Sequence, residues 1–472
     1  MLSIIILSCK NESKISKIEI IKSDLNFIVT TNPIDEITLL WKNNDTIYSN
    51  ERDEFVISKK IEKPYFSTIT IENTQLKTII LPNKNIQINY LDSTYVFKGE
   101  NAKGMELLNS FKRPFFNINE MQKFNKDTTA QQIKEKIINL KQRELTQLQS
   151  LINSNSIDLS FGVLIKTEID YFYALKINKI ILSKQYQKIP IKKELLSLLN
   201  KNIEQYPLDI KYKPSHWAQY ANTVLIEKPL YDLQEKGEIN KLKIQELRLE
   251  DKLHRFKYDL IQEYNDLETI EKISAFYINF ASIQNKFEKS LIGIYSDFTN
   301  KYPKSNYSDY LKPDIDKIKN YHIIIAKEMP KTVQFINGKD INSLNDLIKE
   351  LKIEKYYVDI WATWCGPCKN EFKYNKELEK LLKSKGYKKL YISIDRKEVI
   401  QKWKDNIKYY NLEGLHLLAN KQFVKSFTKD YAIYKGYLRI PQYLLINENG
   451  ELVTNNAPRP SSISELKYIL EK

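Results

Sequence analysis

The chain of 472 residues has little cysteine, histidine and glycine, and these shortages exclude several kinds of site. The four histidines are scattered without the spacing of metal ligands, and a lone Cys-x-x-Cys pair lacks the four donors of a structural zinc, so no metal is predicted. Among the 11 glycines there is no Gly-x-Gly-x-x-Gly or other phosphate-binding loop. No run of roughly 18 apolar residues occurs, so no membrane-spanning helix is expected.

Arginine is scarce as well. The eight arginines show no cluster of the kind that binds phosphates or base edges, so no nucleic-acid partner is predicted. The formal net charge of +15 comes almost wholly from lysine. We interpret this excess as a solvated surface, and weak attraction to an acidic membrane surface is the most that it indicates.

Two of the three cysteines lie close together, directly after a predicted strand. An apolar strand at 356–360 leads into Cys365-Gly366-Pro367-Cys368, and residues 370–385 have the pattern of an amphipathic helix. At a helix N-terminus the free N–H groups and the dipole favour a thiolate. The first cysteine, expected to be exposed, should be nucleophilic near neutral pH, since lowering its pKa from about 8.5 to about 7 takes roughly 2 kcal/mol. The pattern indicates thiol–disulfide exchange with no cofactor besides this dithiol, and the alternative is a static structural disulfide.

On these residues, the segment 331–472 resembles the thioredoxin superfamily, and more closely its TlpA/ResA-like thiol–disulfide oxidoreductases. The resemblance implies an α/β thioredoxin fold, with Asp359 as a buried carboxylate beneath the second cysteine. It also implies a second acid, Glu371, three residues after Cys368. The alternative for Asp359 is a buried acid with a purely structural role. The alternative for Glu371 is an exposed acid in the first turn of the helix. Lys373 stands where the family often has proline, which leaves the expected helix kink open.

The resemblance also implies a mechanism. Cys365 would attack the disulfide of a protein substrate, and Cys368 would resolve the mixed disulfide. Asp359 would take the proton from Cys368, and Glu371 would tune both thiols. The Gly-Pro dipeptide between the cysteines is that of thioredoxin, which favours a reductase supplied by a membrane thiol electron donor. The implied substrate-binding residues are Trp364, Gly366, Pro367, Ile440 and Pro441, with Pro441 in the cis form beside the dithiol.

The third cysteine, Cys9, follows the apolar run 2–8, and this segment resembles the end of a bacterial lipoprotein signal. Cys9 would then carry a lipid anchor and place the protein in the bacterial cell envelope, facing the periplasm. The start, Met1-Leu2, provides no positively charged segment, which we interpret as a truncated signal from a mis-assigned start codon. The alternative is that residues 1–7 begin a core strand.

The remainder divides into a β-rich and a helical part. Short runs rich in β-branched and aromatic residues predict strands of a small β-sandwich at 27–30, 37–42, 55–58, 66–71, 77–81, 86–90 and 95–97. Apolar spacing predicts helices at 129–152, 161–182, 192–205, 239–264, 269–302 and 307–321. In the redox segment we expect a strand at 390–395, a helix at 397–410, an antiparallel edge at 443–446 and 451–454, and a last helix at 462–470. The aromatic residues of the helical part are interpreted as core rather than as a peptide groove.

The sequence thus predicts a multidomain protein with an N-terminal β-sandwich, a helical middle region and a C-terminal α/β thioredoxin fold. The expected parts are a lipoprotein signal segment (1–9), the β-sandwich domain (15–100), the helical domain (105–327) and the redox domain (331–472). The expected function is a membrane-anchored periplasmic oxidoreductase that reduces disulfides of envelope proteins. The alternative is an envelope binding or scaffold lipoprotein whose first two domains grip a partner and whose thioredoxin module is accessory.

Overall fold

The computed structural model divides the chain into two compact units, Met1–Ile318 and Lys319–Lys472. The boundary falls within one helix, α12. The described residues are 15–22, 29–34, 45–47, 54–60, 64–71, 74–82, 84, 86–91, 94–111, 113, 118–284, 286–352, 354–434 and 436–471. Cys9, the whole signal segment and the whole strand expected at 37–42 therefore lie outside the described residues, as do residues 27 and 28 of the strand expected at 27–30.

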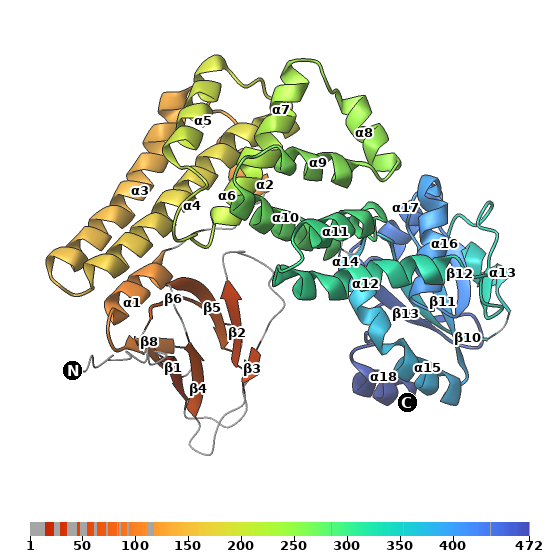
Figure 1. The fold of residues 1–472 in the computed structure, drawn as a ribbon. Helices are drawn as coiled ribbons and strands as arrows, with labels where there is room; N and C mark the ends of the chain where they lie inside the picture. Colours follow the sequence, from red (N-terminus) through yellow and green to blue (C-terminus); the bar gives the residue numbers. More distant parts are fainter. Residues whose placement is uncertain are drawn as a thin grey trace, which may run out of the picture. The chain divides into compact units, whose positions relative to one another are not determined.

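In the described part of residues 15–98, eight strands form two four-stranded sheets (Figure 1). The sheets have the orders β4-β1-β7-β8 and β3-β2-β5-β6. The strands are β1 (Ile15–Lys22), β2 (Val29–Ile34), β3 (Asp45–Ile47), β4 (Glu54–Lys60), β5 (Tyr65–Ile71), β6 (Thr74–Ile80), β7 (Ile86–Leu91) and β8 (Thr94–Lys98). Strand β1 pairs parallel with β7 and antiparallel with β4. Packing of the two sheets into a sandwich stays a prediction.

The rest of the N-terminal unit is helical, as expected. Its elements are α1 (Ala102–Ser110), α2 (Ile118–Gln122), α3 (Ala130–Asn153), α4 (Leu159–Tyr186), α5 (Lys193–Gln205), α6 (Trp217–Asn222), the π-helical turn η1 (Thr223–Glu227), α7 (Lys228–Glu235), α8 (Lys241–Leu249), α9 (Leu253–Gln262), α10 (Leu267–Ser282), α11 (Ser290–Lys301) and α12 (Tyr307–Ile325). Helix α3 begins at a capping box in which Thr129 and Gln132 satisfy each other's backbone N–H groups. Helices α3 and α4 lie side by side (Figure 1) and bury apolar side chains against each other.

Two of the predicted helices are wrong in length, because each is divided. Residues 239–264 form α8 and α9, separated at Asp251, whose φ of 55° is left-handed. The Asp251 carboxylate accepts hydrogen bonds from the Ser290 N–H and hydroxyl at 2.9 and 2.8 Å. Residues 269–302 likewise form α10 and α11, with Phe287 at φ 58° between them. Apolar spacing does not reveal such tertiary bonds, and so it overestimates helix length.

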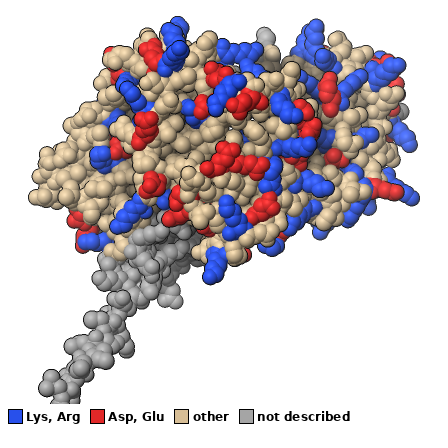
Figure 2. All heavy atoms as spheres, turned by 45° about the horizontal axis from the view of Figure 1, so that its top comes forward, with Lys and Arg blue, Asp and Glu red and all other residues tan. Residues whose placement is uncertain are grey.

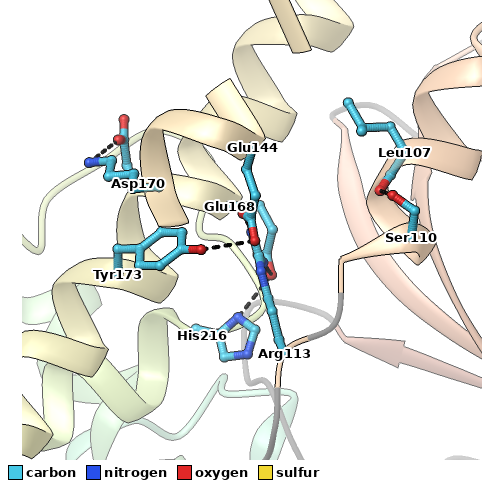
Figure 3. A network of polar contacts seen from close by, with 9 residues as sticks. Leu107, Ser110, Arg113, Glu144, Glu168, Asp170, Tyr173 and His216 are labelled. Atoms are coloured by element: carbon cyan, nitrogen blue, oxygen red, sulfur yellow. Dashed lines mark hydrogen bonds and ion pairs between the residues drawn. The ribbon is translucent and has the colours of Figure 1, made fainter. Parts of the chain in front are cut away.

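A network of charged groups is buried in the helical region (Figure 3). Arg113 donates to Glu144 of α3 at 2.6 Å and to Glu168 of α4 at 3.4 Å. Glu168 is completely buried, accepts a hydrogen bond from the Ser215 N–H at 2.8 Å and lies 2.8 Å from His216 Nδ1. Burying a carboxylate has a high free-energy cost, because the group loses its hydration, and here several hydrogen-bond donors offset that cost.

Positive neighbours keep Glu168 ionised. Burial alone would raise the pKa of Glu168, but the charge of His216, the hydrogen bond with it and the charges of Lys77 and Arg113 hold the pKa at about 2. Burial lowers the pKa of His216 itself, although the charge of Glu168 and the hydrogen bond with it act in the opposite direction. The Arg113 guanidinium also lies 4.3 Å from the centroid of the Phe172 ring. The network joins α3, α4 and the segment after α1 by polar contacts that neither helix pattern indicated.

The C-terminal unit contains a six-stranded mixed sheet of order β14-β13-β10-β11-β12-β9. Its strands are β9 (Val333–Phe335), β10 (Lys355–Trp361), β11 (Tyr387–Ser393), β12 (Gly414–Leu418), β13 (Gln442–Ile446) and β14 (Leu452–Thr454). Its helical elements are α13 (Leu344–Glu350), α14 (Gly366–Glu371), η2 (Phe372–Tyr374), α15 (Asn375–Ser384), η3 (Lys397–Val399), α16 (Ile400–Tyr409), α17 (Lys421–Asp430) and α18 (Ile463–Leu470). The strands and helices expected in this segment are all present, each within a few residues. The central strand β10 pairs parallel with β11 and antiparallel with β13, as in a thioredoxin-like fold.

The central strand β10 is covered on both faces. Val358 and Ile360 pack in an apolar cluster with residues of α13 and α17. Tyr357 packs in a second cluster with α15 and α18, and Trp361 in a third with α16. Side chains alternate along a strand, so Asp359 shares the face of Tyr357 and Trp361. The strand therefore directs this carboxylate toward the face that α14 and α15 cover.

The surface carries both signs of charge. On the face shown in Figure 2, Lys and Arg side chains are scattered among Asp and Glu rather than gathered in one patch. Within the described ranges, no helix has the length and apolar character needed to cross a bilayer. The same ranges contain no group of three His, Cys, Asp or Glu side chains suited to hold a metal ion.

Candidate redox site

The two cysteines lie where β10 passes into α14, and they are joined by a disulfide. Cys365 has extended backbone angles and is the N-cap of the helix. Its sulfur accepts a hydrogen bond from the Cys368 N–H at 3.1 Å. This donor is one of the first-turn N–H groups that have no partner within the helix, and it would stabilise a thiolate at Cys365 in the reduced form.

The expected exposure of the first cysteine is wrong for the disulfide form. Cys365 is 4% exposed and Cys368 is completely buried. Both belong to an apolar cluster with Trp361, and Ile440 packs against that cluster. In contrast, the neighbouring Trp364 is 66% exposed. Apolar neighbours thus cover both sulfurs almost entirely, while the adjacent indole lies in solvent.

The loop before Cys365 is held by Asp395, a residue that the sequence analysis missed. Its buried carboxylate accepts hydrogen bonds from the Thr363 N–H at 2.7 Å, the Thr363 hydroxyl at 2.8 Å and the Ser393 hydroxyl at 2.8 Å. Trp361 and Ser393 are paired in the parallel strands β10 and β11. Thr363 and Asp395 each lie two residues beyond that pair, so the register itself brings them together.

The helix is interrupted after Cys368 although residues 369–384 contain no proline. The segment consists of α14, one 3₁₀ turn at Phe372–Tyr374 and then α15. Lys373 lies within that turn. The interruption expected from the resemblance is therefore present, and the departure at Lys373 does not remove it. Phe372 packs edge to face on Trp361, with ring centroids 5.3 Å apart, and this contact connects the turn to the cluster around the disulfide.

Asp359 is a buried acid without full hydrogen bonding. It is paired in the sheet with Tyr391 of β11 and Tyr443 of β13, and Tyr391 belongs to the cluster that contains both cysteines. In the described structure its Oδ1 atom is buried and has no hydrogen-bond partner. Burial raises the pKa of Asp359 to about 7, although the charge of Lys389 acts in the opposite direction and Glu371 adds to the increase. A carboxyl group with such a pKa can exchange protons near neutral pH.

Two further charged side chains adjoin this acid. Lys389 of β11 is buried, and its Nζ lies 3.2 Å from Glu379 Oε1; burial lowers the pKa of this lysine. The sequence analysis did not single it out, because a lysine in a strand is normally at the surface. Glu371 is buried too, which excludes the exposed alternative. Its two carboxylate oxygens accept from the Ser461 N–H and hydroxyl at 2.9 and 3.2 Å, so its bonds are with Ser461.

The remaining predicted site residues lie around the disulfide. The Ile440–Pro441 peptide bond is cis, and Ile440 packs against the cluster of the two cysteines. Gly366 and Pro367 are exposed between the buried cysteines. Trp364, Gly366 and Pro367 are thus exposed beside the cysteines in the chain, and Ile440 packs against their cluster, whereas Cys9 lies outside the described residues.

Comparisons with known proteins agree with this geometry. Residues 327–470 match the Redoxin family model. They are also 28% identical over 132 residues to the thiol–disulfide oxidoreductase ResA of Bacillus cereus, a match that covers 27% of this chain and 67% of the relative. The C-terminal unit is a TlpA/ResA-like thiol–disulfide oxidoreductase. A second ResA from Bacillus cereus is 33% identical to the oxidoreductase unit over 90 residues, which is 19% of this chain and 48% of that relative.

Solved structures were matched by the same part of the chain. The thioredoxin domain of a thiol–disulfide oxidoreductase from Bacteroides vulgatus is 22% identical, with a TM-score of 0.22; the match covers 26% of this chain and 81% of that one. A thioredoxin-family thiol:disulfide interchange protein from Chlorobium tepidum is 21% identical, with a TM-score of 0.22, and the match covers 26% of this chain and 83% of that one. Both matches concern the oxidoreductase unit alone.

Proposed function

We propose that the protein reduces disulfides of other proteins through Cys365 and Cys368. In the reduced form, the Cys365 thiolate attacks one sulfur of the substrate disulfide, that S–S bond breaks, and one substrate thiolate leaves. Cys368 then loses its proton and attacks the sulfur of Cys365, which releases the second substrate thiolate. The substrate gains two electrons and the dithiol loses two, so a thiol electron donor must reduce the Cys365–Cys368 disulfide again.

Asp359 is the proposed acceptor of the Cys368 proton, directly or through water. Its burial on the face of α14 and its raised pKa of about 7 support this role. Glu371 is proposed to act on the thiols through Asp359, because its negative charge raises the pKa of that residue. Trp364, Gly366, Pro367, Ile440 and Pro441 are the proposed contacts of the substrate segment.

The observation that carries the proposal is the Cys365–Cys368 disulfide at the first turn of α14, in a unit of the Redoxin family. The test uses the reduced full chain and rapid alkylation near neutral pH, followed by peptide mapping. Cys365 should react well before Cys368, because the N-cap position of Cys365 stabilises its thiolate, whereas Cys368 has no such position and is completely buried. Equal rates would contradict these roles.

Client proteins can be identified with matched cysteine variants. Cys368→Ala should accumulate mixed disulfides with substrates in the native cell, whereas Cys365→Ser should form none and should lose reductase activity. A Cys365→Ser variant that kept the full biological effect would contradict the reductase function. It would instead favour the alternative of a binding or scaffold lipoprotein, for which the helical region supplies a cavity of about 920 Å³ beside α3 and α4.

We also propose that the protein is a lipoprotein of the bacterial envelope that faces the periplasm, with a membrane thiol transporter as electron donor. The supporting pattern is the apolar run before Cys9. With two or more acyl chains, the processed protein should stay with the membrane fraction after a high-salt wash. Cys9→Ala should be released or remain unprocessed. If a processed Cys9→Ala protein stayed on the membrane, the lipid anchor would be excluded.

A further inference from the structure

The segment between α17 and β13 presents a pair of tyrosine rings to solvent. Tyr434 and Tyr437 are 42% and 56% exposed, and their ring centroids are 5.6 Å apart at an interplanar angle of 14°. The Tyr437 N–H donates to the Tyr434 carbonyl at 3.3 Å, and Gly436 between them has a φ of 93°. This turn holds the two rings beside each other without burying them.

A positive charge is fixed on the same turn. The Arg439 guanidinium lies 5.5 Å from the centroid of the Tyr434 ring, and its Nη1 donates to the Tyr434 hydroxyl at 3.3 Å. In the described part of the C-terminal unit, Arg439 forms no ion pair, so most of its five N–H donors remain available. A guanidinium with free donors matches the two oxygens of a carboxylate.

Backbone alternation explains why these side chains point outward. Leu438 and Ile440 pack against the core cluster of the sheet, whereas Tyr437 and Arg439, at the intervening positions, are exposed. Ile440 also packs against the cluster that contains Cys365 and Cys368. Three residues of extended chain span at most about 10 Å, so Tyr437 lies within that distance of Ile440. A short extended peptide can therefore reach the disulfide and the tyrosine pair together.

We infer that Tyr434, Tyr437 and Arg439 form a recognition platform for protein substrates whose cystine is flanked by an acidic residue and an aromatic or apolar residue. This rests on the proposed disulfide-reductase function. The acid binds Arg439, and the apolar side chain packs on the tyrosine pair. Tyrosine and arginine are enriched among the residues that carry most binding energy at protein interfaces. Here both types lie a few residues before Ile440, which packs against the cluster of the two cysteines.

The test compares rates for disulfide-bonded peptides that differ at one position beside the cystine. One pair has Glu or Lys, and a second pair has Phe or Ser. Each rate of oxidation of the reduced full chain is divided by the rate of the same variant with bis(2-hydroxyethyl) disulfide. The wild-type protein should prefer Glu over Lys and Phe over Ser, each by about three- to tenfold, in line with partly exposed contacts.

The variants separate the two contacts. Arg439→Gln should remove the preference for Glu alone, Arg439→Lys should keep part of it, and Tyr434→Ser/Tyr437→Ser should remove the preference for Phe. The controls Arg248→Gln on α8 and Tyr468→Ser on α18 should keep both preferences. Equal preferences in the wild type and Arg439→Gln would overturn the platform. If the wild type fails even with bis(2-hydroxyethyl) disulfide, the reductase function on which the platform rests is overturned as well.

Discussion

Glu168 in the helical region and Asp359 in the oxidoreductase unit are both buried carboxylates, and their surroundings differ in almost every respect. Glu168 has an arginine, a histidine and a backbone N–H within hydrogen-bond distance, and its pKa is about 2. Asp359 has one buried oxygen without a described partner, and its pKa is about 7. The comparison teaches that burial alone does not define the role of an acid; the donors around it decide whether it holds a charge or exchanges a proton.

The largest expected effect is on stability, at Glu168. Glu168→Gln should lower the free energy of unfolding of the helical region by about 3–5 kcal/mol, because Arg113 stays buried with one of its partners gone. Urea denaturation followed by circular dichroism measures this change. The control is Asp170→Asn on the same helix, whose carboxylate pairs with two partly exposed lysines and should cost about 1 kcal/mol or less. Equal costs for the two variants would show that Glu168 is no more than an ordinary ion-pair partner.

At Asp359 we expect a substitution to lower activity without lowering stability, in contrast to Glu168. Asp359→Asn should slow turnover by about 10- to 100-fold, because Cys368 loses its proton acceptor, while stability is unchanged or higher. The first attack by Cys365 should change much less, so the mixed disulfide should accumulate in quenched reactions. In a Cys368→Ala background the Asp359→Asn substitution should have little further effect. Intact turnover with a lower melting temperature would make Asp359 a structural acid.

The dependence of stability on pH should have opposite signs for the two acids. The pKa of Asp359 is about 7 when folded and about 3.9 when unfolded, so its contribution is present below about pH 4 and is lost as pH rises toward 7. Glu168 has a folded pKa of about 2, so its contribution is present above about pH 4.3 and is lost as pH falls toward 2.

Urea denaturation across this pH range tests both signs. Relative to the wild type, Asp359→Asn should gain about 1 kcal/mol per pH unit between pH 4 and 7. The deficit of Glu168→Gln should instead shrink below about pH 4. Parallel pH profiles for the two variants would contradict the contrast between the two sites.

A third buried carboxylate, Asp395, should give the smallest effect, because neutral donors satisfy it. Thr363→Val removes one of its three hydrogen bonds and keeps the shape of the side chain. The expected cost is about 1 kcal/mol of unfolding free energy, measured by thermal denaturation of the full chain. Thr428→Val on α17 serves as the control, since its hydroxyl bonds only to the helix backbone. If Thr363→Val lowered the free energy of unfolding as much as Glu168→Gln, neutral donors would stabilise a buried carboxylate as strongly as cationic ones.

Local patterns in the sequence were enough to predict the central strand and the dithiol at a helix start, and the family resemblance that these residues carry implied the acid at Asp359. Each of these depends on residues within about ten positions of one another. The contacts that hold the site in place join distant segments: Thr363 and Asp395 are 32 residues apart, and Glu371 and Ser461 are 90 apart. The first of these pairs could have been found, because both residues follow the ends of neighbouring parallel strands. Nothing in the sequence pattern connected Glu371 with Ser461.

Helix limits and buried cations were harder to predict for a related reason. The break at Asp251 depends on hydrogen bonds to Ser290, and the lysine at 389 is buried only because the sheet and Glu379 enclose it. Periodicity describes which face of an element is apolar. It does not show which polar group on another element will bond to a polar residue that departs from the pattern.

The small exposed area of Cys365, 4% in the disulfide form, limits which molecules can react with it. A sulfur nucleophile approaches along the axis of the bond that it breaks, so a recessed disulfide accepts only a partner whose own sulfur projects from its surface. In the proposed reaction that partner is the thiol donor, which must reduce the Cys365–Cys368 disulfide after each turnover. A donor whose cysteine lies on a projecting segment can reach the recessed sulfur. A donor whose cysteine lies in a flat or concave surface cannot.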